Sequence, residues 1–240
     1  MNTLEQISQE RLVLSDNTIH VYLIKFDLFD NKQCIQYLSE DERIRAEKLK
    51  IEEKKNQFVI TRSVLRLLLS SAIAKSYQDI EFLYGEHGKP IINEYLNNKP
   101  VEFNISHSGN YALIAITLSN KVGVDIEGVN IDIDHQSLSK RFFSKDEKNE
   151  LINLVDEVQL DTFYRIWARK ESFIKATGKG VAYGLDQFSV TLDETIDGGT
   201  EVLTFNPLDD KWFCYDLINI DNYKTALTTT NKTCDIVIHA

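Results

Sequence analysis

Two carboxylates in the segment GVDIEG stand at a spacing that could hold a metal ion. Asp125 and Glu127 alternate along an expected strand, so both side chains leave the same face with their Cα atoms roughly 6.5–7 Å apart. Two carboxylates this close repel each other unless a cation or solvent lies between them. Oxygen ligands favour a hard ion. A site with only two or three carboxylates favours Mg²⁺, which also keeps water and phosphate oxygens as ligands, over a Ca²⁺ ion enclosed by protein. The alternative for this pair alone is a strand end that points into water.

A second set of chemical groups lies in the segment RIWARKESFIKATGKG, residues 165–180. On a helix, Trp167, Glu171 and Lys175 stack along one side. An ordinary Glu–Lys pair four residues apart would contribute only about 0.2–0.5 kcal/mol. The many apolar neighbours leave little of this helix for solvent, however, and a partly buried glutamate beside a lysine should have a perturbed pKa. Glu171 is therefore a candidate third metal ligand or general base, and Lys175 could neutralise charge on a phosphate.

The segment FNISHSGNY offers Ser106 and His107 at the end of an expected strand, before a glycine turn. A histidine there can face a cleft, although a structural role is the more common one. The serines do not form a G-x-S-x-G nucleophile elbow. The Gly-Lys pairs in GEHGKP and ATGKGV lack the spacing of a phosphate-binding P-loop, so nucleotide-loop motifs are excluded.

The length and composition of the chain limit the classes of protein to which it can belong. The 240 residues, 42% of them hydrophobic, are enough to bury a full core in one domain or two small ones. The net charge of −10 argues against nucleic acid and acidic membrane surfaces as partners. We expect no membrane span and no signal peptide. The three cysteines are far apart without a C-x-x-C pair, so we expect a reduced cytoplasmic protein.

Periodicity predicts the elements of the first part of the chain. Residues 19–26 alternate as a strand, and Ser39 with Glu42 forms a capping box at a helix start. A long core helix is expected from about 52 to 75. Strands 101–107 and 111–117 follow, joined by a tight turn.

The second part begins with the apolar segment KVGVDIEGV, a buried strand. Ser144 and Glu147 form a second capping box, and Asp161 is expected to cap a helix that ends near Gly178. The remaining residues predict short strands in FSVTL, EVLTF, WFCYDL, KTALTTT and CDIVI. Because helices and strands mix without strict alternation, the pattern predicts an α+β fold.

Taken together, the motifs FNISHSG, GVDIE and W-x-x-K-E-S-F-I-K resemble the 4′-phosphopantetheinyl transferases of the broad-specificity, surfactin-synthetase-activating (Sfp) type. GEHGKPII, RFFSKDE and GKGVAYGLDQFSV support the match, which covers about residues 38–192. The resemblance implies a pseudo-dimer of two similar α+β halves, each with a long helix packed on an antiparallel sheet. We expect the halves at 1–119 and 120–240, with the metal site in the second half and coenzyme A in the cleft between them.

The resemblance also implies roles for individual residues. Asp125, Glu127 and Glu171 would be the Mg²⁺ ligands, the cation would bridge the coenzyme A pyrophosphate, and Glu171 and Lys175 would be catalytic. The residues expected to contact coenzyme A are Arg43, Arg45, Arg62, Lys89, Ser106, His107 and Lys175. The arginines replace two lysines that some members use for the 3′-phosphate, and Gln57 stands where close relatives have an arginine.

The implied function is transfer of 4′-phosphopantetheine from coenzyme A to a serine of apo carrier proteins, with release of 3′,5′-ADP. We expect peptidyl or acyl carrier domains of nonribosomal peptide or polyketide synthases, hence antibiotic biosynthesis, and a monomeric enzyme. Three alternatives stay open: a holo-acyl-carrier-protein synthase for fatty-acid synthesis, a non-catalytic carrier-binding module, and a Mg²⁺-dependent phosphohydrolase.

Overall fold

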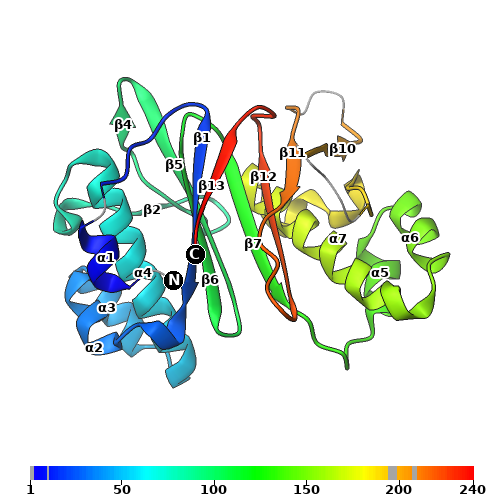
Figure 1. Cartoon of the computed structure of the whole chain (residues 1–240), viewed down its shortest axis with the longest axis horizontal. Helices are drawn as coiled ribbons and strands as arrows, with labels where there is room; N and C mark the ends of the chain where they lie inside the picture. Colours follow the sequence, from blue (N-terminus) through cyan, green and yellow to red (C-terminus); the bar gives the residue numbers. More distant parts are fainter. Residues whose placement is uncertain (1–2, 10, 194–198, 207–209) are drawn as a thin grey trace.

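The protein consists of two sheets packed face to face, each covered on its outer side by helices (Figure 1). The computed structural model describes residues 3–9, 11–193, 199–206 and 210–240. The layers are therefore helix, sheet, sheet, helix. This mixture confirms the predicted α+β class with one long helix per half.

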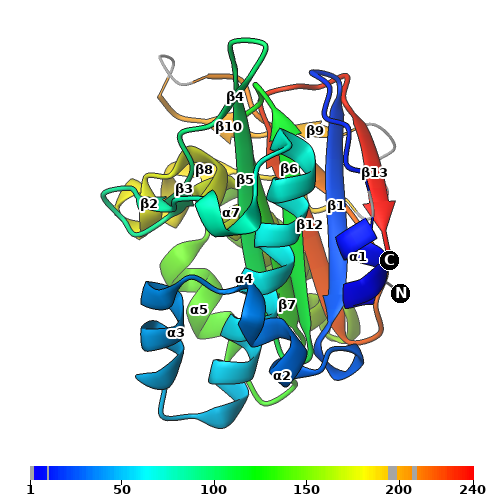
Figure 2. The same cartoon turned by 90° about the vertical axis from the view of Figure 1, so that its left-hand side faces the viewer.

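The first sheet has the strand order β13-β1-β6-β5-β4. Its strands are β13 (Asp235–His239), β1 (Thr18–Lys25), β6 (Tyr111–Leu118), β5 (Lys99–Ser108) and β4 (Tyr95–Leu96). Four helices lie on its outer face: α1 (Leu4–Gln9), α2 (Asn31–Cys34), α3 (Glu40–Glu47) and the long α4 (Glu52–Ile73). Figure 2 looks onto this face, where α4 lies in front of the strands and runs in roughly the same direction as they do.

The second sheet has the strand order β7-β12-β11-β9 and is antiparallel. Its strands are β7 (Val122–Gly128), β12 (Tyr223–Thr229), β11 (Phe213–Asp216) and β9 (Thr200–Glu201). The helices on its outer side are α5 (His135–Phe142), α6 (Lys145–Ile152) and the long α7 (Asp156–Thr177). Two further strand pairs are short: β2 (Leu83–Tyr84) with β3 (Pro90–Ile91), and β8 (Phe188–Ser189) with β10 (Leu203–Thr204).

Three apolar clusters match these layers. One lies under α4, a second lies under α7, and a third lies between the sheets. In the third, Val21 and Leu113 of the first sheet pack with Val124 and Leu227 of the second, and all four are fully buried. Strands buried on both faces are mostly apolar, which is why β6 reads as a nearly continuous hydrophobic run, whereas β7 interrupts its apolar residues with Asp125 and Glu127.

Besides this apolar cluster, hydrogen bonds from the backbone of β7 to side chains of β5 join the two sheets. Short polar residues at alternate positions of β5 accept hydrogen bonds from alternate backbone N–H groups of β7. The pairs are Asn104 Oδ1 with Val124 N at 2.9 Å, Ser106 Oγ with Ile126 N at 3.4 Å, and Ser108 Oγ with Gly128 N at 3.0 Å. These six residues, which we call the seam, satisfy buried N–H groups that would otherwise cost free energy.

Most elements predicted from periodicity are confirmed. The first strand, α4, the hairpin of β5 and β6, and β7 lie where the pattern places them, and both capping boxes are present. The prediction that Asp161 caps α7 is wrong, because the helix begins at Asp156 with Val155 as its N-cap. Asp161 instead uses its carboxylate in ion pairs with Arg165 and with Lys224 of β12.

The last strand of the chain returns to the first sheet. β13 pairs in parallel with β1, from Thr18 opposite Asp235 to Tyr22 opposite His239. The expected boundary between halves at residue 119 stays a prediction, and the first sheet also takes this strand from the far end of the chain. Among the helices of the described residues, none is long and apolar enough to cross a membrane.

Candidate active site

Three elements meet at the carboxylate of Asp125. Lys175 Nζ, from the last turn of α7, lies 2.5 Å from Asp125 Oδ1 and 2.7 Å from Ser106 Oγ. The Ser106 hydroxyl of β5 donates to the same Asp125 oxygen at 2.9 Å. Asp125 is only 1% exposed. The lysine ammonium therefore compensates a charge that would be costly if it were buried alone.

Two further carboxylates, Glu127 and Glu171, lie near this cluster and have raised pKa values. Burial raises the pKa of Glu127 to about 7, and the charges of Asp125 and Glu171 add to the rise, whereas Lys175 and a hydrogen bond from Trp167 oppose it. Burial and the charge of Asp125 also raise the pKa of Glu171. β7 and α7 thus bring together the three carboxylates that the sequence singled out.

The donor atoms suit a hard divalent cation. Asp125 Oδ2 is buried and has no hydrogen-bond partner among the described residues. Carboxylate oxygens that repel one another are the ligand type that Mg²⁺ prefers. Within the described parts of the chain, however, no group of three or more His, Cys, Asp or Glu side chains has the geometry of a metal site. The ligand types fit Mg²⁺, and the magnesium site itself stays a proposal.

A cavity of about 240 Å³ adjoins Lys175. We call it the Lys89 cavity; it is lined by His87, Gly88, Lys89, Pro90, Asn104, Ile105, Ile174, Lys175, Gly178 and Gly180. Burial lowers the pKa of Lys89, whose Nζ lies 3.4 Å from the carbonyl of Val122. His107 follows on the same strand, and desolvation of its ring by surrounding protein atoms, with the charges of Lys175 and Lys54, lowers its pKa.

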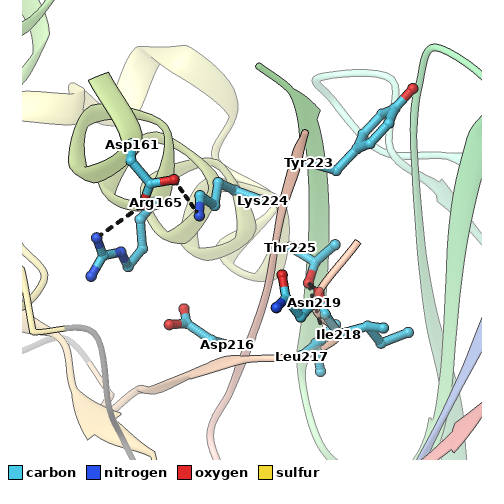
Figure 3. A pocket seen from close by; sticks show the side chains of 9 residues that line it. All are labelled: Asp161, Arg165, Asp216, Leu217, Ile218, Asn219, Tyr223, Lys224 and Thr225. Carbon is cyan, nitrogen blue, oxygen red and sulfur yellow. Dashed lines mark hydrogen bonds and ion pairs between the residues drawn. The ribbon is translucent and has the colours of Figure 1, made fainter. Parts of the chain in front are cut away.

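Another cavity, of about 380 Å³, lies at the other end of α7 (Figure 3). Lys224 of β12 reaches Asp161 on α7 at 2.6 Å, and Arg165 lies 3.3 Å from the same carboxylate. Asp216 in its wall accepts from Arg169 at 2.8 and 2.5 Å. Each carboxylate already has a cationic partner, so this cavity is a weaker candidate for chemistry than the Asp125 cluster.

Comparison with known proteins decides the family. A sequence model described as the 4′-phosphopantetheinyl transferase superfamily matches residues 121–228, and one for the N-terminal part of such transferases matches residues 29–119. The 4′-phosphopantetheinyl transferase HetI of Nostoc sp. is 33% identical over 186 residues, which cover 77% of this chain and 78% of HetI. The chain belongs to the 4′-phosphopantetheinyl transferase family. This membership confirms the resemblance and the enzyme class that it implied.

Two further phosphopantetheinyl transferase relatives extend the comparison. The 4′-phosphopantetheinyl transferase Sfp of Bacillus subtilis is 34% identical over 166 residues, which cover 69% of this chain and 71% of Sfp. A Synechocystis sp. protein whose name places it in the same class is 37% identical over 150 residues, 62% of this chain. The match spans 61% of the Synechocystis protein.

The arginines expected to bind coenzyme A in this transferase have different surroundings. Arg43 and Arg45 are exposed on α3, and Arg45 Nη1 donates to the hydroxyl of Tyr84 at 3.1 Å. Arg62 is only 4% exposed, and its Nε lies 3.5 Å from Glu42. None of the three lines the Lys89 cavity. Their role as ligands of coenzyme A stays a prediction, with the weakest support for Arg62 because its charge is already paired.

Sequence reasoning missed residues that hold the elements of this candidate site together. Asn104 and Ser108 hold β5 against β7, and Gln57 Nε2 donates to the carbonyl of Gly109 at 2.8 Å, which anchors the hairpin tip to α4. The signal was the alternation of short polar residues in N-I-S-H-S beside an apolar strand. Gly123 was missed as well.

Gly123 allows α7 to lie directly on β7. A Cβ at this position would overlap the Ser172 carbonyl oxygen and the Ala176 nitrogen, and would lie 2.8 Å from the Ala176 Cα. Because these are backbone atoms, Gly123→Ala must shift the helix that carries Glu171 and Lys175. We expect a loss of about 1–3 kcal/mol in the free energy of unfolding, measured by urea denaturation.

Gly85→Ala is the matched control for this substitution. Its Cβ would meet the Lys89 carbonyl oxygen at 3.7 Å, an ordinary contact. If both variants unfold at the same urea concentration as the unmodified protein, the close approach of α7 to β7 is not needed for stability.

Proposed function

We propose that this chain transfers the 4′-phosphopantetheine group of coenzyme A to a serine hydroxyl of apo carrier proteins and releases 3′,5′-ADP. The observation that carries the proposal is the meeting of Ser106, Asp125 and Lys175 beside two carboxylates of raised pKa. In a member of this family, that arrangement suits a pyrophosphate substrate better than a purely structural ion pair.

Asp125, Glu127 and Glu171 would hold Mg²⁺. The support is the unpartnered Asp125 Oδ2 and the raised pKa values of Glu127 and Glu171, both of which a divalent cation would relieve. When bound, Mg²⁺ neutralises and polarises the pyrophosphate of coenzyme A.

The side chains of this chain would then carry the transfer. Glu171 accepts the proton of the carrier serine as the general base. The serine oxygen forms a bond to the phosphorus that bears pantetheine. The bond from that phosphorus to the bridging oxygen breaks, and 3′,5′-ADP leaves with that oxygen and the electron pair. Lys175 neutralises the charge that develops on the leaving phosphate.

Other residues would position coenzyme A. Ser106 and His107 lie beside Lys175 and would contact the phosphates. The Lys89 cavity would take the adenine end. Arg43 and Arg45 are exposed cations that could reach the 3′-phosphate; Arg62 would have to give up part of its pairing with Glu42.

The expected partners are peptidyl or acyl carrier domains of nonribosomal peptide or polyketide synthases. We also propose a monomer in the cytoplasm, in line with three free cysteines. The alternative of a fatty-acid acyl-carrier-protein synthase differs only in which carrier is preferred. A non-catalytic carrier-binding module would not require three neighbouring carboxylates beside a lysine.

The direct test is the intact mass of an apo peptidyl carrier domain incubated with this protein, coenzyme A and Mg²⁺. A gain of one phosphopantetheine group that disappears when the metal is chelated supports the proposal. An apo fatty-acid acyl carrier protein in parallel reports the preferred class. Binding of carriers without any mass gain would indicate the binding module, and pantetheine phosphate released without a carrier would indicate a hydrolase.

We expect the free energy of unfolding of the metal-free protein to depend on pH through Glu127. Its pKa is raised from 4.5 to about 7 in the folded state, so between these values the folded chain binds more protons than the unfolded chain. The contribution of this carboxyl to stability therefore falls as pH rises from 4.5 to 7. We expect Glu127→Gln, measured in a chelator, to gain roughly 1–3 kcal/mol relative to the unmodified protein between pH 5 and pH 8. If the free energies of unfolding of Glu127→Gln and the unmodified protein differ by the same amount at pH 5 and pH 8, the raised pKa of Glu127 is contradicted.

A further inference from the structure

Lys224 stands directly opposite Glu127 on two neighbouring strands, because the antiparallel register of β12 and β7 pairs these two residues. Residues paired in this way point to the same face of a sheet, with their Cβ atoms about 4.5–5.5 Å apart. Here that face lies under α7: Lys224 reaches Asp161 of this helix, and Glu127 accepts a hydrogen bond from Trp167 of the same helix. A lysine and a glutamate in such positions are expected to form an ion pair.

Lys224 is instead paired with Asp161. Its Nζ lies 2.6 Å from Asp161 Oδ1, and Figure 3 shows the lysine extended toward this carboxylate. Among the described residues, no second carboxylate forms an ion pair with Lys224. Asp161 precedes Trp167 by six positions on α7, a rise of about 9 Å along the helix axis. The two facing side chains therefore diverge, Lys224 toward the N-terminal part of α7 and Glu127 toward its C-terminal part.

The position of Lys224 depends on charge and not on close packing. Its side chain is 27% exposed, that of Asp161 is 48% exposed, and the cavity of about 380 Å³ at this end of α7 adjoins both. Asp161 holds one cation with each oxygen, because its Oδ2 lies 3.3 Å from Arg165. Without the charge of Asp161, Lys224 is left beside Glu127. A partly buried carboxylate attracts a neighbouring ammonium group more strongly than an exposed one does.

We propose that Asp161 is a positioning residue of the metal site, which holds Lys224 away from Glu127 so that this carboxylate stays available to Mg²⁺. The inference rests on the proposed function, in which Glu127 is one of three metal ligands. An ammonium group paired with Glu127 would repel the metal ion and take the place of a ligand bond. Lys175 already lies against Asp125 in the same cluster. A second lysine would leave little negative charge there for a divalent cation.

The test is a double-mutant cycle on the affinity for Mg²⁺. Mg²⁺ is titrated by calorimetry into the metal-free unmodified protein, Asp161→Asn, Lys224→Met and the variant that combines both substitutions. We expect Asp161→Asn to bind Mg²⁺ about three- to fivefold more weakly, the effect of a partly exposed ion pair between Lys224 and Glu127. Lys224→Met should bind at least as tightly as the unmodified protein, and the combined variant should bind as tightly as Lys224→Met. The Mg²⁺ concentration that gives half the maximal rate of carrier modification should follow the same order.

The cycle distinguishes competition by Lys224 from two other effects of losing Asp161. If Asp161 acts only through its own charge or by fastening α7, Asp161→Asn weakens Mg²⁺ binding by the same factor whether Lys224 is present or replaced, and the inference is overturned. Asp216→Asn is the matched control, because this carboxylate lines the same cavity and pairs with Arg169 of α7. It should leave the Mg²⁺ affinity within a factor of about two, as for a substitution away from the site. A loss equal to that of Asp161→Asn overturns the inference.

The outcomes also separate this inference from the proposed function. Weaker Mg²⁺ binding by Asp161→Asn that Lys224→Met restores supports the inference. Equal Mg²⁺ affinity of Asp161→Asn and the unmodified protein overturns it while the proposed transfer stands. If the unmodified protein binds no Mg²⁺, the inference is overturned, and the mass gain of an apo carrier decides separately whether the proposed transfer stands.

Discussion

Glu171→Gln is expected to lower the rate of carrier modification by about 10²–10⁴-fold, the range typical of a general base. Glutamine keeps the size and one carbonyl oxygen of the side chain but can neither accept the serine proton nor contribute charge to a metal site. Glu171 lies close enough to Asp125 and Lys175 for both to shift its pKa, so the loss acts at the centre of the cluster. The measurement is the initial rate of mass gain on an apo carrier domain at saturating coenzyme A.

Glu157→Gln is the control for this prediction. Glu157 lies in the first turn of the same helix and is exposed, so its loss of charge should leave the rate within a factor of about two, as for a surface substitution worth less than 0.5 kcal/mol. Thermal denaturation of both variants checks that the fold is intact. A Glu171→Gln protein that modifies the carrier at the unaltered rate would remove Glu171 from the proposed mechanism.

Lys170→Met should produce the largest loss of stability among the substitutions considered. Lys170 is completely buried, and its Nζ donates to Glu147 Oε1 at 2.7 Å and to the Phe188 carbonyl at 2.8 Å. Glu147 also accepts from the backbone N–H groups of Ser144 and Val190, both at 2.8 Å. Removing the lysine leaves a buried carboxylate without its countercharge, which costs about 3–5 kcal/mol.

Urea denaturation measures this loss of stability, and two further variants serve as controls. Lys145→Met removes an exposed lysine at the start of α6 and should change the free energy of unfolding by less than about 0.5 kcal/mol. Lys170→Met combined with Glu147→Gln should recover part of the loss, because glutamine still accepts hydrogen bonds but is neutral. Equal stability of the Lys170 and Lys145 variants would show that the buried pair contributes nothing.

Lys170 also shows how a motif residue can be misassigned. It stands next to Glu171 in W-x-x-K-E-S-F-I-K, and sequence alone does not distinguish a lysine that binds substrate from one that holds a helix cap. The structure ties Lys170 to the capping-box glutamate of α6 and to the strand after α7. Lys175, five residues later, points to Asp125 and Ser106 instead. The difference follows from the side of α7 that each residue occupies.

Local sequence patterns predicted the helices and strands whose formation depends on residues close together in the chain. The apolar stripe of α4, the alternation in β1, β5 and β6, and both capping boxes depend on residues close in sequence, and the structure confirms them. Asp161 failed as a helix cap for a tertiary reason: its carboxylate is taken by Lys224, sixty-three positions away on another element. An intrinsic preference for a cap is worth only about 1 kcal/mol, which such contacts can override.

The sequence by itself determined the chemistry: three carboxylates, a lysine, a serine and a histidine, in motifs whose order resembles one transferase family. Only the tertiary structure decided how they meet. The seam between β5 and β7 brings Ser106 to Asp125, Gly123 lets α7 approach until Lys175 reaches both, and β13 returns to pair with β1. Each of these contacts joins residues far apart in the chain, so it depends on how complete layers pack and not on any local preference.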